Sequence, residues 1–284
     1  MRTLQGLFVV DPAYAAGPDH PSEAGEPFYQ RVIRVAKGVF RAQGTRTTVH
    51  GLENIPREGG ALLAVNHTGW FDFIFAGMGP HLVGRRLVRF MAKSEVFGMP
   101  VIGWLMRGMR HVPVDRSAGA GSIDAAVDFL REGGLVGIFP EGTISRSFEL
   151  SDFKTGGARI AQRAGVPLIP CVIWGSQRIW TKDLPKRLGR TKTPVIVRYG
   201  APVPLEGTPD EVTDRLKSAM AGLLDESRAE YAHTFGPFPQ GERWMPRSLG
   251  GSAPTLAEAE EIYAREKRER AAKKNKKKTD TEKA

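Results

Sequence analysis

Residues 61–77 have the sequence ALLAVNHTGWFDFIFAG, in which an apolar strand-like run, 61–66, leads directly into a helical pattern, 71–77. The run carries no charge, as is typical of a strand buried on both faces of a sheet. Similar runs alternate with helical patterns along the chain. The other expected strands are 47–50, 89–92, 111–114, 135–139, 168–174 and 195–199, and the other expected helices are 101–108, 122–132, 156–164 and 209–229. This alternation predicts an α/β fold, an αβα sandwich around a mostly parallel or mixed sheet of about seven strands.

The N-terminal part of the chain lacks this alternation. Residues 1–25 are rich in Gly, Pro, Ala and acidic groups without periodicity, which predicts a disordered lead, and we expect no signal peptide there. Residues 26–44 predict a basic amphipathic helix that ends near Gly44. That helix is either a surface helix packed on the domain or a helix that lies on a membrane. Residues 45–235 are the predicted main domain.

The C-terminal part, 236–284, also differs in composition. Residues 236–254 are rich in Gly and Pro and predict a linker, 255–272 predict a charged helix, and 273–278 contain five lysines and predict a disordered end. From Tyr263 to Ala284 there are ten Lys or Arg and four Asp or Glu, so this end carries +6 of the total net charge of +10. Such a basic excess fits nucleic acid, anionic lipid or simple solubility.

The composition of the chain excludes several classes of protein. With 41% hydrophobic and 25% charged residues, the chain is typical of a globular protein rather than a fibrous or disordered one. Its single cysteine, Cys171, excludes an intramolecular disulfide and a cysteine-cluster zinc site. The longest uncharged stretch, 164–177, contains two prolines and is shorter than the roughly 18–20 apolar residues that span a bilayer. We therefore expect no transmembrane helix and no bound metal.

The first chemical candidate is the turn after the strand at 61–66. His67 can act as a base near neutral pH, and Asp72 follows five residues later, close enough to hydrogen-bond the distal ring nitrogen. Such a carboxylate fixes the tautomer of the ring and stabilises the imidazolium. Taken alone, the same two residues also fit a structural histidine at a helix N-terminus.

Two further segments end strand patterns with polar groups. Residues 139–143, Phe-Pro-Glu-Gly-Thr, place Glu141 and Gly142 where a polar ligand can approach, although a simple turn is the plainer alternative. Residues 111–116 end in Asp-Arg, and Arg116 fits either a bidentate phosphate ligand or a local ion pair. A third segment, Val-Pro-Leu-Ile-Pro at 166–170, reads as a buried structural strand.

Taken in order, these segments resemble the four sequence blocks of the glycerolipid acyltransferase family, the PlsC-like family. The blocks span residues 66–170, and the likeness extends over about 45–225. The resemblance implies a glycerol-phosphate acyltransferase-like fold. It also implies transfer of a fatty acyl group from a thioester carrier to a glycerol hydroxyl, normally that of 1-acyl-glycerol-3-phosphate, to give phosphatidic acid for phospholipid synthesis.

The resemblance also assigns roles. His67 is the base and Asp72 orients it, while Arg116, Glu141 and Gly142 bind the glycerol phosphate and Thr143 is the adjoining match. Two weaker candidates for the phosphate are Lys93 and Arg146. Many family members have Arg or Ser directly after the Thr, where this chain has Ile144, so the acceptor could instead be another lysophospholipid, glycerol-3-phosphate or a glycolipid.

The reaction fits these residues. A thioester is already activated, so one positioned base is enough, and such a base is worth roughly 10²–10⁴ in rate. No Gly-x-Ser-x-Gly elbow for a serine nucleophile is present. We expect no bound cofactor, with acyl-CoA or acyl carrier protein as the acyl donor.

The expected partners follow from the lipid substrates. They are a lysophospholipid and an anionic membrane surface, with peripheral attachment at the cytoplasmic face of the cell membrane through 26–43, 96–106 or the basic tail. We expect no nucleic-acid partner, because the core lacks an aromatic and basic stripe. A membrane-binding protein without enzymatic activity is the rival interpretation.

Overall fold

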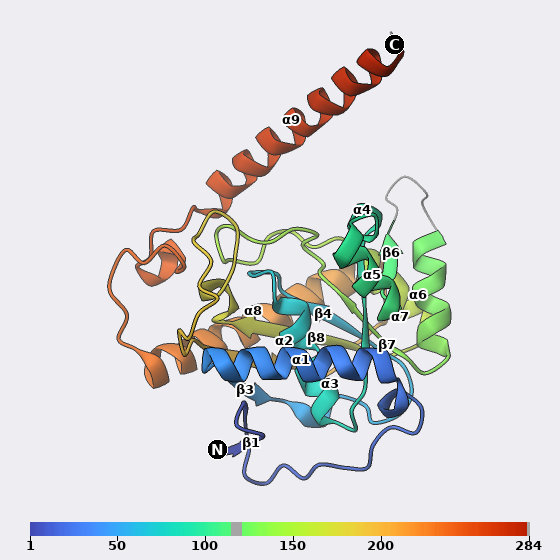
Figure 1. The fold of residues 1–284 in the computed structure, drawn as a ribbon, viewed down its shortest axis with the longest axis vertical. Coiled ribbons are helices and arrows are strands. Elements are labelled where there is room, and N and C mark those ends of the chain that lie inside the picture. The colour runs from blue at the N-terminus through green and yellow to red at the C-terminus, as the bar shows by residue number, and fades with distance from the viewer. Residues whose placement is uncertain (115–120, 283–284) are drawn as a thin grey trace.

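A computed structural model describes the backbone of residues 1–114 and 121–282, and a nine-stranded sheet runs through its centre (Figure 1). The strands are β1 (Arg2–Leu4), β2 (Phe8–Val10), β3 (Arg46–His50), β4 (Ala61–Val65), β5 (Val88–Lys93), β6 (Val112–Val114), β7 (Leu135–Ile138), β8 (Leu168–Trp174) and β9 (Pro194–Tyr199). Their order across the sheet is β1-β2-β3-β9-β8-β4-β7-β5-β6. Strands β8, β4, β7, β5 and β6 are mutually parallel, and β9 is antiparallel to β8. The predicted α/β class is confirmed, but the number of strands is nine rather than about seven.

The two additional strands come from the lead, so the prediction that residues 1–25 are disordered is wrong. Strand β2 pairs in parallel with β3, Phe8 opposite Thr47, and β1 pairs antiparallel with β2. Leu7, Phe8 and Val10 are fully buried. Strands of three residues are too short to show periodicity, and their burial depends on the open edge of β3, which lies far along the chain.

Helices cover both faces of the sheet, which confirms the predicted sandwich. They are α1 (Pro27–Gln43), α2 (Asp72–Ala76), α3 (Met78–Leu82), α4 (Ser94–Phe97), α5 (Pro100–Gly108), α6 (Gly121–Arg131), α7 (Gly156–Ala164), α8 (Pro209–Phe235) and α9 (Leu256–Glu282). One buried cluster joins α1, α2 and α3 to alternate residues of the central strands. A second buried cluster, on the opposite face of the sheet, joins α6, α7 and α8 to the other set of alternate strand residues. Successive residues of a strand point to opposite faces of the sheet. On β4, therefore, Leu63 and Val65 belong to the first cluster, and Leu62 and Ala64 belong to the second.

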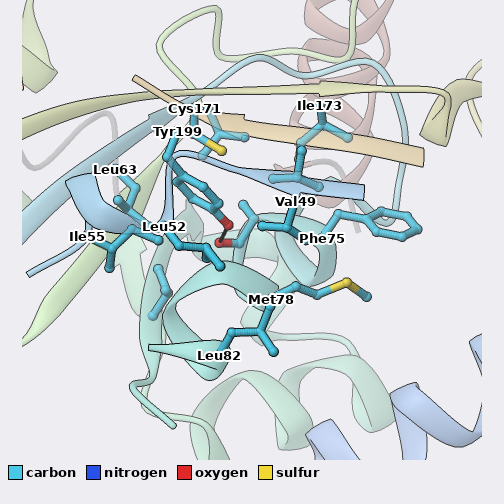
Figure 2. Close-up of a cluster of buried hydrophobic side chains, with 14 of the residues drawn as sticks. Val49, Leu52, Ile55, Leu63, Phe75, Met78, Leu82, Cys171, Ile173 and Tyr199 are labelled. Carbon is cyan, nitrogen blue, oxygen red and sulfur yellow. Dashed lines mark hydrogen bonds between the residues drawn. The ribbon is translucent and has the colours of Figure 1, made fainter. Parts of the chain in front are cut away.

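The cluster on the α1 to α3 face is tied together by Tyr199 (Figure 2). Its hydroxyl donates to the carbonyl oxygen of Ala76 at 2.8 Å and accepts from the N–H of Gly79 at 3.1 Å, which links β9 to α2 and α3. Cys171 lies in the same cluster, and burial raises the pKa of its thiol. Cys171 is therefore an unreactive core residue.

The segment 236–254, predicted as a linker, packs on the second cluster instead. Trp244 and Met245 are buried, and the ring of Trp244 meets that of Phe238 edge to face at 5.0 Å. The guanidinium of Arg178 lies 4.5 Å from the Trp244 ring. Glycines and prolines make this segment irregular, but its aromatic residues bury it against α8.

The C-terminal helix is longer than predicted. We expected a helix over 255–272 and a disordered lysine-rich end, whereas α9 continues through Glu282 and projects from the sheet layers (Figure 1). Its sequence consists mostly of Ala, Glu, Lys and Arg, which have high helix propensity. Among the described helices, none is long and apolar enough to cross a membrane.

Candidate active site

The polar blocks meet at one edge of the sheet because they follow parallel strands. His67 comes after β4 and Glu141 after β7, while Lys93 is the last residue of β5. Val114, the last residue of β6, pairs with Lys93. The carboxyl ends of parallel strands share an edge, which is where open α/β sheets bind ligands. Arg116 follows β6 by two residues, but it lies outside the residues that the structure describes.

His67 and Asp72 form the hydrogen-bonded pair that the sequence predicts. The Nδ1 atom of His67 lies 3.0 Å from Oδ2 of Asp72. The same oxygen accepts the backbone N–H groups of Thr68, at 2.6 Å, and Gly69, at 2.7 Å. Oδ1 accepts the hydroxyl of Ser176. With no exposed surface and four donors, Asp72 is fixed as an acceptor, so the His67 proton resides on Nδ1.

The His67 ring is held on its face as well. It stacks on Phe139, with centroids 4.0 Å apart and planes 21° apart, and Phe139 stacks on Phe90. The side chain of His67 keeps 19% of its surface exposed. In the described part of the chain, no residue hydrogen-bonds Nε2 of His67. That nitrogen can therefore accept a proton from a bound ligand.

Glu141 is directed at the backbone of His67. Its Oε1 accepts the N–H of His67 at 2.9 Å, and its Oε2 accepts from the N–H and hydroxyl of Ser151 at 3.3 and 3.1 Å. Burial, with a smaller contribution from the charge of Asp72, raises the pKa of Glu141 to about 7 against the opposing effect of those hydrogen bonds. The N–H of Ser145 also donates to the carbonyl oxygen of His67 at 2.7 Å. Glu141 and Ser145 thus hold the backbone N–H and the backbone carbonyl oxygen of His67.

The rest of the third block contacts a loop that the sequence did not single out. Gly142 adopts a left-handed backbone with φ of 69°, which turns the chain at this point. The hydroxyl of Thr143 accepts from Nζ of Lys182 at 2.7 Å. The neighbouring Thr181 donates to the carbonyl oxygen of Thr68 at 2.6 Å. Lys182 therefore lies beside the first and third blocks together.

Arg146 is buried and paired with carboxylates. Its Nη2 lies 2.5 Å from Glu266 on α9, and its Nε contacts Asp183. The hydroxyl of Tyr263, also on α9, accepts the N–H of Arg146 at 2.7 Å and donates to the carbonyl oxygen of Ile144 at 2.9 Å. Two carboxylates thus neutralise the predicted phosphate ligand Arg146, and α9 holds the loop that carries it.

The structure therefore brings together His67, Asp72, Glu141, Gly142 and Thr143. Arg146 lies on the same loop, paired with Asp183 and Glu266, and Lys93 lies at the same sheet edge. Whether any of them binds substrate stays a prediction. Among the described residues, no group of three or more His, Cys, Asp or Glu could hold a metal ion.

Comparison with known proteins agrees with this geometry. The family model described as Acyltransferase matches residues 46–174, which contain all four blocks and all of β8. The chain is similar to the PlsC-like acyltransferases. The matched region also contains Arg116 and all of the sheet edge that carries His67.

Relatives of this PlsC-like chain have names that agree with the family. A 1-acyl-sn-glycerol-3-phosphate acyltransferase of Bacillus subtilis is 38% identical over 45% of this chain and 62% of its own length. A chloroplastic 1-acyl-sn-glycerol-3-phosphate acyltransferase of Brassica napus is 30% identical over 62% of this chain and 51% of its own. The chain thus spans about half to three-fifths of the length of these relatives.

A solved structure shows the same fold. The 1-acyl-sn-glycerophosphate acyltransferase PlsC of Thermotoga maritima superposes with a TM-score of 0.53 at 22% identity, over 71% of this chain and 84% of that one.

Several residues of the PlsC-like site lie outside the sequence blocks. They are Ser151, Ser176, Thr181, Lys182, Tyr263 and Glu266. They belong to loops or to α9, where no periodicity or motif marks a single serine, lysine or tyrosine. Only the folded chain places them beside Thr68, Asp72 or the loop 141–146.

Proposed function

We propose that this chain transfers a fatty acyl group from an acyl thioester to the free hydroxyl of 1-acyl-glycerol-3-phosphate, giving phosphatidic acid. The observation that carries the proposal is the His67–Asp72 pair, whose Nε2 faces no described partner at the ligand-binding edge of a PlsC-like fold. The names of the relatives support the acceptor. The donor is acyl-CoA or acyl carrier protein.

The proposed reaction needs one base. Nε2 of His67 takes the proton of the acceptor hydroxyl while the hydroxyl oxygen attacks the thioester carbonyl carbon. Asp72 stabilises the imidazolium through Nδ1–H. When the tetrahedral intermediate collapses, the carbon–sulfur bond breaks and the thiolate takes the proton from His67. An ester and a free thiol are formed, and His67 returns to its neutral state.

A different lipid acceptor is the second candidate. The third block has Ile144 where many family members have Arg or Ser, and Arg146 is neutralised by Asp183 and Glu266. Both observations weaken phosphate recognition by this block. The candidates to hold an acceptor phosphate are then Arg116, Lys93 and Lys182.

We also propose peripheral attachment to an anionic membrane, at the cytoplasmic face of the cell membrane. On α5, Val101 is 70% exposed and Trp104 is 58% exposed, and on α1 Val35 is 68% exposed. Phe28 of α1 meets Trp104 edge to face at 5.0 Å, so the two helices adjoin. Exposed apolar groups beside basic ones are typical of surfaces that bind lipid.

The test is a transfer assay with purified protein, a labelled acyl donor on either carrier, and a panel of acceptors resolved by mass. We expect phosphatidic acid from 1-acyl-glycerol-3-phosphate as the main product. Arg116→Ala should raise the KM for the acceptor far more than that for the donor. Transfer to glycolipids or uncharged acceptors alone would replace the proposed acceptor, and no transfer to any acceptor would contradict the enzymatic proposal.

A further inference from the structure

A cavity of about 410 Å³ lies between the N-terminal lead, α1 and the segment that follows α3. None of the residues that line it belongs to the candidate active site. Its polar lining includes Gln5, Asp19, Gln30, Arg34, Lys37, His81 and Arg85. The cavity exists because the lead, rather than being disordered, pairs with β3 and passes over α1 and α3.

The charges around this cavity are unbalanced. Arg34, Lys37 and Arg85 line it, and Arg41 adjoins it by donating from Nε to the carbonyl oxygen of Gln5 at 2.7 Å. Among the lining residues the one acid is Asp19, which pairs with Arg85 at 3.0 Å. The wall therefore carries cations without enough carboxylates to neutralise them.

Lys37 is the most constrained of these cations. It is half-buried, and its Nζ donates to Oε1 of Gln5 and to Nε2 of His81, each at 3.0 Å. A third N–H of the ammonium is left for another acceptor. Burial and the charges of Arg41, Arg85 and Arg34 lower the pKa of Lys37. An anion beside the ammonium would offset both effects.

His81 keeps this ammonium in place without adding a charge. Because Lys37 donates to Nε2, the ring proton lies on Nδ1 and the imidazole is neutral. Burial and the neighbouring charges of Lys37 and Arg85 together lower the pKa of His81 to about 4, against the opposing effect of Asp19. His81 is 8% exposed, so it is a fixed part of the wall.

The backbone around the cavity is also held in a less favourable conformation. Gln5 and Arg85 both line the cavity and have left-handed φ values of 53° and 56°. Non-glycine residues adopt this conformation at a cost of about 1–2 kcal/mol. In both cases the surrounding packing holds a polar side chain at the cavity.

We propose that this cavity binds a phosphate monoester, supplied either by a lipid headgroup or by a soluble phosphate compound. A phosphate dianion offers several acceptor oxygens, which suit one ammonium N–H and the forked donors of two arginines. Dianionic charge also matches the excess of cations in the wall. The site is separate from the His67 centre and does not depend on the proposed function.

The first experiment measures binding of inorganic phosphate by calorimetry and by thermal unfolding at constant low ionic strength. The variant is Lys37→Met, and the matched control is Arg31→Gln, an exposed residue of α1 that does not line the cavity. Removing a charged hydrogen-bond donor should weaken phosphate binding about tenfold or more in Lys37→Met. Arg31→Gln should bind as the parent does.

An Arg116→Ala variant separates the cavity from the acceptor site. Phosphate binding that survives Arg116→Ala but is lost in Lys37→Met supports the cavity. The proposal is overturned if phosphate binding is lost in Arg116→Ala but kept in Lys37→Met. It is also overturned if the parent and Lys37→Met bind phosphate equally. Arg34→Gln, an exposed change, gives the same comparison if Lys37→Met does not fold. Loss of acyl transfer has no bearing on these measurements.

The source of the phosphate is separated with phosphatidylcholine vesicles that contain or lack phosphatidic acid. If the headgroup is the ligand, Lys37→Met should lose most of the extra binding that phosphatidic acid confers, and Arg31→Gln should keep most of it. If the parent binds inorganic phosphate but Lys37→Met and the parent sediment equally with phosphatidic acid, a soluble phosphate compound is the ligand.

Discussion

The first and third sequence blocks lie side by side at the sheet edge but are held in opposite ways. In the first block, Asp72 reaches back to His67, Thr68 and Gly69, all within five residues of it. The loop from 141 to 146 is held by residues between 10 and 120 positions away, among them Ser151, Lys182, Tyr263 and Glu266. The hydrogen bond that orients the proposed base is local, although Ser176 and Glu141 also hold this pair from a distance. The loop beside it is held mainly by distant parts of the chain.

Of all the substitutions, His67→Ala should cause the largest loss in the rate of acyl transfer. Without Nε2, no group is left to take the hydroxyl proton, and we expect acyl transfer to fall by roughly 10²–10⁴ or below detection. The ring is partly exposed, so the fold should persist, as circular dichroism and thermal unfolding would check. A folded variant with the parent's rate would remove His67 from the mechanism.

Asp72→Asn should have the next largest effect on the rate. An asparagine has neither the charge to stabilise an imidazolium nor the acceptor capacity for four donors, and its amide group can favour the wrong tautomer of His67. We expect kcat to fall by at least about a hundredfold with a smaller change in KM. A change confined to stability would mean that Asp72 serves only the turn. Asp124→Asn, at an exposed ion pair, is the matched control.

Glu141 connects the two blocks, and its titration tests that connection. Its folded pKa, raised to about 7 by burial, exceeds the ordinary value of a glutamate, so the native state binds more protons. Stability should therefore fall as pH rises from about 4.5 to about 7, by up to about 3 kcal/mol, and then level off. Glu141→Gln should flatten this fall. Urea unfolding of both proteins across that pH range makes the comparison, and parallel pH profiles would contradict it.

Tyr263→Phe should have the smallest effect and acts on the third block alone. It removes the hydroxyl that joins the N–H of Arg146 to the carbonyl oxygen of Ile144, but it keeps the ring beneath the guanidinium. We expect the acceptor KM to rise about threefold to tenfold, equivalent to one lost hydrogen bond, with kcat nearly unchanged. Tyr14→Phe, in the lead, is the matched control. An equal KM change in both variants would rule out a role for α9 in the loop.

Much of the fold and half of the site could be predicted from sequence. The sequence predicts strands β3 to β9, because most of them are continuous apolar runs. It predicts the His67–Asp72 pair because both residues lie on one turn. The predicted disorder of residues 1–25 and the predicted linker at 236–254 were wrong. Both segments are irregular in composition, and both are ordered by contacts with distant residues such as Thr47 and Tyr231.

The sequence by itself determined the α/β class, the order of the blocks and the hydrogen bond between His67 and Asp72, because each depends on residues close together in the chain. The tertiary structure alone decided that Glu141 faces the His67 backbone, that Arg146 is neutralised, and that the lead closes a basic cavity over Lys37. Hydrogen bonds and ion pairs between distant segments form only after the sheet has assembled, and no local periodicity records them.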